Sequence, residues 1–386
     1  MRASPMYSDD ELLSHISLAH LYENFISVFQ GTLSGCVVNF VESVKTLQQN
    51  LEEVLPTVFI GVPRTWEKMM SNIEMRITDS TRLKRALYRL GIRLSLQYLR
   101  AEDDRWKRMF RKLLYLPFLL MVFRPLKKRI GFERIRVALC AGAPISPQIF
   151  EYFNALGIPL REAYMQTEST GPIAIQRIDH PRWGFAGEPI PEVEVRINGD
   201  GEILVRGAGI SKGYFREYDI EDCRAKHGWL YTGDYGAIDD GFLKVLGRKS
   251  ERIVTAGKDR INPSLIEAEL RFSRYIQDAL VFGNGRNHLV ALILIDESHI
   301  TKYAQDRIIP FTTFADLTKN AQIRGLIECE VSKVNTALSD KERIEKFELL
   351  PRCFYEEDGE VTPTKRLKRF ILEMQFKDLI QRMYQE

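Results

Sequence analysis

Short apolar runs alternate with helical repeats in the first half of the chain. Residues 57–62 form an apolar run of strand length that Pro63-Arg64 ends, and Trp66 opens a predicted helix. Residues 135–139 and 158–160 are further apolar runs, separated by about twenty residues, the spacing of a βα unit. This alternation predicts an α/β sheet domain.

Hydrophobic periodicity also predicts a long helix over residues 80–112. Leucines recur there at intervals of four, three and four residues, so the helix has one apolar face: Leu83, Leu87, Leu90 and Leu94. Basic residues lie largely off that face: Arg82, Lys84, Arg85, Arg89 and Arg93.

Residues 113–123 are the most lipid-like run of the chain. The run is too short for the ~20-residue span of a membrane helix, and it contains Pro117. Basic residues flank it on both sides: Arg108, Arg111, Lys112, Arg124, Lys127, Lys128 and Arg129. Two interpretations are open: a peripheral membrane contact that meets anionic head groups, or a core-packed helix with solvated ends.

From residue 184 the pattern changes to short alternating strands. Residues 193–197 and 202–206 flank Asn198-Gly199-Asp200-Gly201, whose residues tolerate the positive φ of hairpin turns. Residues 210–214, 229–231 and 242–246 continue the pattern. This stretch predicts a small antiparallel β subdomain.

Beyond Gly247-Arg248-Lys249-Ser250 the pattern changes again. Strands are predicted at 279–282 and 289–295, and helices at 262–271, 313–338 and 364–384. We therefore expect an α/β protein in three parts. These are a partial N-terminal α/β sheet domain at 1–183, its β subdomain at 184–247, and a mobile C-terminal α+β domain at 248–386.

Composition narrows the class of protein. The 386 residues are 45% hydrophobic and 28% charged, which is ordinary for a globular protein of two or three domains. A net charge of +3 gives no case for a nucleic-acid polymer as the main partner. The five cysteines are scattered without a CxxC pair, and the N-terminus lacks a signal-peptide core. Both observations favour a reducing, cytoplasmic location.

Two polar loops follow predicted strands. Residues 164–171, Tyr-Met-Gln-Thr-Glu-Ser-Thr-Gly, place an aromatic ring, an amide, hydroxyls and a carboxylate directly behind one apolar run. Cys140-Ala141-Gly142-Ala143-Pro144 follows the run before it. Because α/β proteins bind ligands in loops at the carboxyl ends of strands, we expect the two loops to converge on one pocket.

With Tyr231-Thr232-Gly233-Asp234 and Gly247-Arg248, these motifs stand in an order that resembles the AMP-forming acyl-CoA synthetases. Residues 59–68, Phe-Ile-Gly-Val-Pro-Arg-Thr-Trp-Glu-Lys, and Thr362-Pro363-Thr364 are similar to the long-chain fatty acid branch. The resemblance implies ATP-dependent activation of a long-chain fatty acid to an acyl-adenylate, then transfer to CoA. It implies ATP/AMP, Mg²⁺ and CoA as the cofactors and co-substrates.

Such a reaction requires phosphate charge to be neutralised and the reactants to be held in line. The resemblance implies that Glu168 holds Mg²⁺, that Thr167 donates its hydroxyl to a phosphoryl oxygen, and that Tyr164 stacks on adenine. A capping or surface carboxylate is the alternative for Glu168. The resemblance implies further nucleotide contacts from four residues: Gly142, Ala143, Pro144 and Gln166.

Asp234 can accept both ribose hydroxyls, and Gly233 lets the backbone come close. Arg248 would be a second ribose or phosphate contact. Family members rotate the C-terminal domain about a hinge that matches Ser250. Residues 253–261 resemble the loop that lines the CoA tunnel, where Gly257 would provide mobility, although an ordinary hairpin is the alternative.

The family places an adenylation lysine after Thr362-Pro363-Thr364. Strict register puts Arg366 at that position, and Lys365, one place earlier, is the expected catalytic lysine. The Ser/Thr/Gly-rich loop ending Pro-Lys-Gly, with which the family grips ATP, has no counterpart in this sequence.

We therefore expect the chain to be the C-terminal two-thirds of a long-chain synthetase, with a complementing N-terminal fragment as a possible partner. Two other functions stay open. One is a non-catalytic nucleotide- or acyl-binding remnant. The other is an adenylating enzyme that loads an acidic carrier protein docked near residues 124–129.

Overall fold

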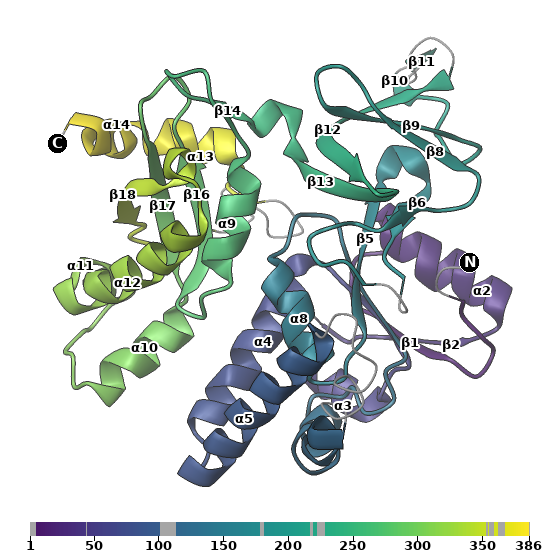
Figure 1. Cartoon of the computed structure of the whole chain (residues 1–386), viewed down its shortest axis with the longest axis horizontal. Coiled ribbons are helices and arrows are strands. Elements are labelled where there is room, and N and C mark those ends of the chain that lie inside the picture. The colour runs from purple at the N-terminus through teal and green to yellow at the C-terminus, as the bar shows by residue number, and fades with distance from the viewer. Residues whose placement is uncertain are drawn as a thin grey trace. The chain divides into compact units, whose positions relative to one another are not determined.

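The structure is a computed structural model that describes residues 5–43, 45–100, 113–177, 181–216, 219–221, 228–352, 354, 359–361 and 367–385. The chain divides into two compact units, Met1–Val245 and Leu246–Glu386 (Figure 1). Lys365 and the rest of residues 362–366 lie outside the described residues. Among the helices that are described, none has the length and apolar character needed to cross a membrane.

A sheet with a parallel half organises the first unit. Its described strands lie in the order β2-β1-β3-β4-β5-β6-β7, and the pairs from β2 to β5 are parallel. The last two strands run antiparallel to their neighbours. The strands are β1 (Glu11–Ser14), β2 (Val37–Phe40), β3 (Val58–Gly61), β4 (Val137–Ala141), β5 (Leu160–Gln166), β6 (Gly171–Ile175) and β7 (Glu188–Pro189).

Helices cover this sheet. They are α1 (Leu21–Glu23), α2 (Gly31–Ser34), α3 (Leu47–Val54), α4 (Pro63–Thr78), α5 (Arg82–Leu99), α7 (Arg124–Arg129) and α8 (Pro147–Ala155), with π-helical η1 (Asn24–Gln30) and η2 (Leu119–Phe123). Helix α4 begins at Pro63 and not at Trp66, because proline has no N–H to lose at the first helical position. Trp66 is fully buried and donates its ring N–H to the Leu139 carbonyl oxygen at 3.2 Å, which ties α4 to β4.

The predicted strand at 57–62 is confirmed, and the one at 135–139 is confirmed with a shift, since β4 begins at Val137 and runs to Ala141. The run at 158–160 precedes its strand, because β5 begins only at Leu160 and runs to Gln166. Cys140, Ala141 and residues 164–166 therefore lie in strands and not in loops. Strands β4 and β5 are adjacent and parallel, with Ala141 opposite Ala163. Their carboxyl ends lie at the same edge of the sheet, as the two polar motifs predicted.

Helix α5 confirms the predicted helix over its described part, but its packing is a surprise. The residues that it buries are Tyr88, Gly91 and Ser95. The leucine face expected from the periodicity lies outward, and the exposed fraction of Leu83 is 69%. The run at 113–123 is also partly buried and partly exposed: Tyr115 and Phe123 are buried, while Met121 is 78% exposed. The segment therefore packs through some of its side chains and exposes others, and a peripheral membrane contact there stays a prediction.

A second sheet, in the order β13-β12-β9-β8, forms the predicted β subdomain. Its strands are β8 (Val193–Ile197), β9 (Glu202–Gly207), β12 (Leu230–Asp239) and β13 (Phe242–Arg248). The hairpin at Asn198 is confirmed, since its side-chain oxygen accepts from the Glu202 N–H at 2.8 Å. The strand predicted at 210–214 is wrong: β10 (Tyr214–Arg216), paired with β11 (Asp219–Glu221), begins only at Tyr214.

The second unit is an α+β body around a three-stranded sheet of β16 (Ile276–Phe282), β17 (Leu289–Ile295) and β18 (Ile344–Leu349). Every residue of β17 is buried, and separate apolar clusters pack on its two faces. The described helices are α9 (Pro263–Arg271), α10 (Glu297–Asp306), α11 (Phe314–Lys319), α12 (Ala321–Ala337), α13 (Arg369–Gln375) and α14 (Lys377–Gln385).

The helix predicted over 313–338 is split in two. Asn320 ends α11 and caps α12, because its side-chain oxygen accepts from the N–H groups of Gln322 and Ile323. Strand β18 was not predicted. The last predicted helix likewise divides into α13 and α14.

Candidate active site

Asp234 lies at the centre of the polar network in the first unit. Its Oδ2 accepts a hydrogen bond from the Tyr164 hydroxyl at 2.6 Å and another from Gln166 Nε2 at 2.6 Å. Gln166 also donates to the Thr232 carbonyl oxygen at 2.9 Å. Asp234 is only 5% exposed, so these charge-assisted bonds hold its carboxylate in a defined position. Strand β5 of the large sheet thereby orients a carboxylate on β12 of the small one.

The turn that carries Asp234 is tightly built. The β12–β9 register shifts between Tyr231 and Tyr235, which marks a bulge. The Thr232 hydroxyl accepts from the Asp234 N–H at 3.1 Å and donates to the Ile203 carbonyl oxygen at 2.7 Å. Gly233 has a φ of 67°, and its N–H donates to Glu202 Oε1 at 3.0 Å. Because φ is positive, glycine suits this position best.

Thr167 and Glu168 lie on a one-turn 3₁₀ helix, Thr167–Ser169, directly after β5. A capping box between Gln166 and Ser169 closes this turn, with the Ser169 hydroxyl accepting from the Gln166 N–H at 3.1 Å. Thr167 is exposed and Glu168 is half-buried. The Tyr214 hydroxyl donates to the Glu168 carboxylate. The turn thus presents a hydroxyl and an oriented carboxylate at the edge of the sheet.

The second strand-end loop comes from β4. Gly142 is exposed, and Ala143 and Pro144 are half-buried. The loop leads into α8, where the Ser146 hydroxyl caps the helix by accepting from the Gln148 N–H at 3.3 Å. Topology therefore brings these residues to the same edge as Thr167 and Glu168.

Tyr164 is placed differently from the expectation that its ring faces adenine. The ring is only 8% exposed and belongs to a buried cluster with Ile173, Ile203 and Leu243. Little of its face is available for stacking, and its hydroxyl is used to orient Asp234.

The predicted residues of the second unit lie on its first segment. Arg248 ends β13, and Ser250 lies in the exposed 3₁₀ turn Lys249–Glu251. Residues 253–261 form a hairpin of β14 (Ile253–Val254) and β15 (Arg260–Ile261). Gly257 lies in the turn between these two strands, and the residue of that turn with a positive φ, 64°, is Lys258. The mobility expected from Gly257 stays a prediction.

Sequence reasoning missed three supporting residues, Glu202, Tyr214 and Ser169. Glu202 begins β9, and its buried carboxylate accepts from the Gly233 N–H. The one signal available in the sequence was an acidic residue at the start of a predicted strand. Tyr214 contacts Glu168 across 46 residues of sequence, and no local pattern indicates such a pairing.

Two titratable groups, Cys140 and Glu162, lie opposite each other on β4 and β5. Burial raises the pKa of the Glu162 carboxyl to about 7. Burial, with Glu162 and Glu67 nearby, raises the pKa of the Cys140 thiol well above its usual range. Cys140 is therefore a neutral core residue and not a nucleophile.

The side chains near the site can be compared with those that Mg²⁺ requires as ligands. Among the described residues no group of three or more His, Cys, Asp or Glu side chains could cage a metal. Mg²⁺ usually takes one or two protein carboxylates and completes its shell with phosphate and water. Glu168, half-buried and oriented by Tyr214, fits that single-carboxylate role.

Comparison with known families gives two matches that follow one another along the chain. Residues 1–215 match the AMP-binding enzyme family, and residues 250–386 match the C-terminal domain of AMP-binding enzymes. Among curated proteins, the long-chain-fatty-acid–CoA ligase FadD15 of Mycobacterium bovis is 31% identical over 97% of this chain and 62% of its own. The ligase ACSBG2 of Gallus gallus is 28% identical over 97% of this chain and 52% of its own. The chain thus spans between half and two-thirds of the length of these relatives.

Solved structures share the fold. The adenylation domain of a carboxylate reductase from Mycobacterium chelonae has a TM-score of 0.73 at 16% identity, covering 98% of this chain and 54% of that one. The O-succinylbenzoate CoA synthetase of Bacillus subtilis, in complex with ATP and magnesium, has a TM-score of 0.60 at 19% identity, covering 96% and 62%. At these identities the likeness shows the α/β fold of adenylate-forming enzymes.

Proposed function

The chain belongs to the AMP-binding enzyme family, and on that premise we propose that it activates a long-chain fatty acid with ATP and transfers the acyl group to CoA. The fatty-acid specificity is supported by the names of relatives at 31% and 28% identity. The products are acyl-CoA, AMP and diphosphate.

The first step gives the acyl group a good leaving group, and the second step displaces it. The fatty carboxylate attacks the α-phosphorus of ATP and diphosphate leaves, which gives an acyl-adenylate. The CoA thiol then attacks the acyl carbon, loses its proton and displaces AMP. Bound Mg²⁺ would neutralise phosphate charge, and Glu168 would hold it.

Four side chains of the first unit take the remaining roles. Thr167, exposed at the sheet edge, donates its hydroxyl to a phosphoryl oxygen. Asp234 accepts from the ribose hydroxyls, and Tyr164 orients it. Gln166 supports the same carboxylate. The observation that carries the proposal is that β5 anchors the Asp234 carboxylate through Tyr164 and Gln166 and leads directly into the turn that carries Thr167 and Glu168.

Palmitate-dependent release of AMP in the presence of ATP, Mg²⁺ and CoA tests the proposal. The assay is run on the chain alone and with a polypeptide that supplies the Ser/Thr/Gly-rich loop of the family. Glu168→Ala should abolish release under whichever condition is active. Full release by Glu168→Ala would overturn the assigned role.

The adenylation lysine and the acyl acceptor need tests of their own. We propose Lys365 as the lysine, so Lys365→Ala should lose adenylation while Arg366→Ala retains it. The reverse result would assign the role to Arg366. Comparing CoA with an acidic carrier protein under identical conditions decides between the two acceptors, and CoA should be used faster.

A non-catalytic nucleotide-binding protein is a second candidate. The observations that favour it are that no stretch of this sequence matches the Ser/Thr/Gly-rich loop of the family and that strict register puts Arg366 where the adenylation lysine belongs. A titration with ATP separates the two candidates. Binding without AMP release, even with the missing loop supplied, would favour the second.

A further inference from the structure

The leucine stripe of α5, defined as Leu83, Leu87, Leu90 and Leu94, is a surface feature. Leu83, Leu87 and Leu90 are all exposed, and the helix packs through the adjoining face that carries Tyr88, Gly91 and Ser95. An amphipathic helix in a globular protein ordinarily turns its apolar stripe to the core. A stripe that faces outward marks an interaction surface.

The stripe continues onto the helical segment 113–123. Tyr98 of α5 stacks on Tyr115, with ring centroids 5.8 Å apart, and a side chain at Gly91 would clash with Phe118 and Phe123. Leu87 and Leu94, four residues before and three after Gly91, lie on that same side of α5. The exposed residues of the segment are Leu113, Leu114, Leu116, Leu120 and Met121. Together with the stripe they form what we call the apolar face.

The borders of the apolar face are basic. Residues 81–100 contain six Lys and Arg residues and no acid, and residues 113–132 contain four and no acid. Arg82, Arg85, Arg89 and Arg93 follow one another at helical spacing beside the stripe, so they lie along one side of α5. Residues 101–112 include three acids in sequence and lie outside the described residues.

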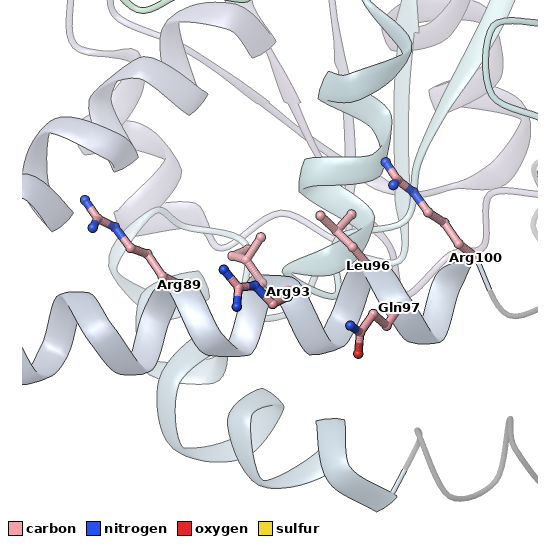
Figure 2. Close-up of a pocket in the computed structure, with 6 residues that line it drawn as sticks. Arg89, Arg93, Leu96, Gln97 and Arg100 are labelled. Atoms are coloured by element: carbon pink, nitrogen blue, oxygen red, sulfur yellow. The ribbon is translucent and has the colours of Figure 1, made fainter.

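The arginine side of α5 is hollowed. Arg89, Arg93 and Arg100 follow one another along a hollow of about 460 Å³ whose lining also includes Ile92, Leu96 and Gln97 (Figure 2). Arg100 pairs with Glu151. In the described part of the chain, neither Arg89 nor Arg93 forms an ion pair, so both guanidinium groups are available to anions. Guanidinium groups suit the geometry of phosphate.

We propose that the apolar face docks on the surface of a bilayer that contains anionic phospholipids. Leu83, Leu90 and Met121 enter the boundary of the acyl chains, and Arg89 and Arg93 contact head-group phosphates. Charge complementarity favours an anionic bilayer over a protein partner, because apolar residues are bordered by cations on both segments. The inference rests on the proposed function in one respect: a long-chain fatty acid partitions into the bilayer, so docking would place the site beside its substrate.

Flotation of the full chain with vesicles tests the proposal. Vesicles of phosphatidylcholine with added phosphatidylglycerol should bind the chain at low salt, and pure phosphatidylcholine should bind it at least about tenfold more weakly. The double variant Arg89→Glu/Arg93→Glu and the single variant Met121→Glu should each lose at least about tenfold in binding.

Matched controls lie in the second unit. Lys319→Glu/Lys377→Glu makes the same change in net charge at exposed positions, and Met374→Glu makes the same substitution at a methionine that is 63% exposed. Both controls should bind as the parent does. Circular dichroism melting confirms that every variant is folded.

Two results would overturn the proposal. The first is vesicle binding that is absent, or that the controls reduce as much as the face variants do. The second is a change of oligomeric state, measured by light scattering, that Met121→Glu abolishes, since that would assign the face to a second copy of the chain. The assay contains neither ATP nor CoA, so failure of the ligase proposal leaves its outcome unchanged.

Discussion

The hydroxyl of Tyr164 donates to Asp234 Oδ2 at 2.6 Å, across 70 residues of sequence. The bond joins β5 of the large sheet to β12 of the small one. It therefore couples the placement of the ribose-binding candidate to the strand that ends in Thr167 and Glu168. A polar network of this kind defines one arrangement of the site when all of its members are paired.

Tyr164→Phe should destabilise the first unit and weaken nucleotide binding. Removing the hydroxyl leaves a buried carboxylate with one donor fewer, which costs about 1–3 kcal/mol in the free energy of unfolding. Urea unfolding and a titration with AMP measure the two effects. Tyr231→Phe is the matched control, since Tyr231 is half exposed on β12, the strand of Asp234, and it should change neither quantity. Equal behaviour of the two variants would show that the bond is dispensable.

Glu168→Gln should remove the magnesium dependence of ATP binding. The amide keeps the size and can still accept from Tyr214, but it lacks the charge that Mg²⁺ prefers in a ligand. Calorimetric titration with ATP, with and without Mg²⁺, gives the difference directly. Glu192→Gln, at an exposed position of the β subdomain, should leave that difference intact. A parent-like magnesium effect in Glu168→Gln would place the metal elsewhere.

Gly233→Ala should cost about 1–2 kcal/mol of stability, because an L-residue is strained at the φ of 67° found there. Gly199→Ala provides the contrast. A side chain at Gly199 meets nothing within 4 Å and its φ is not in the left-handed region, so this variant should be neutral or slightly stabilising. Thermal unfolding of both variants measures the effect, and equal losses would contradict the account of the turn.

Two buried groups should give opposite contributions to the pH dependence of stability. Burial lowers the pKa of His15, stacked on Phe59, from 6.5 to about 4. The unfolded chain binds more protons between those values, so this contribution to stability rises with pH from 4 to 6.5. Burial raises the pKa of Glu162 from 4.5 to about 7, so its contribution falls as pH rises through that window.

In the pH range where both groups contribute, the two slopes of stability against pH oppose each other. A variant that removes one group should therefore reveal the slope of the other. His15→Leu should leave stability falling from pH 4.5 to 7, and Glu162→Gln should leave it rising from pH 4 to 6.5. Urea midpoints measured across this range test both. The same profile in both variants would mean that other groups dominate.

Much of the fold could be predicted because it follows from local patterns. The apolar runs identified β3, β4 and β5, and the parallel βα logic then placed their end loops together. The bond from Tyr214 to Glu168 could not be predicted, because contacts between distant segments leave no period in the sequence.

The sequence did not predict which face of helix α5 is buried. The spacing of Leu83 and Leu90 gives a helix with an apolar stripe, but periodicity does not say whether the stripe faces the core or a partner. The small residues Gly91 and Ser95 determine which face of α5 packs, because they let the helix approach its neighbours closely.

Palmitate-dependent release of AMP from ATP, in the presence of Mg²⁺ and CoA, is the decisive test of the proposed ligase activity. Assays compare the parent chain and Asp234→Ala, each with the phosphate-binding loop of the family supplied in trans. The account predicts release that requires palmitate and is lost in Asp234→Ala, with acyl-CoA formed in equal amount. A folded parent chain that binds AMP no better than Asp234→Ala and releases none would contradict it.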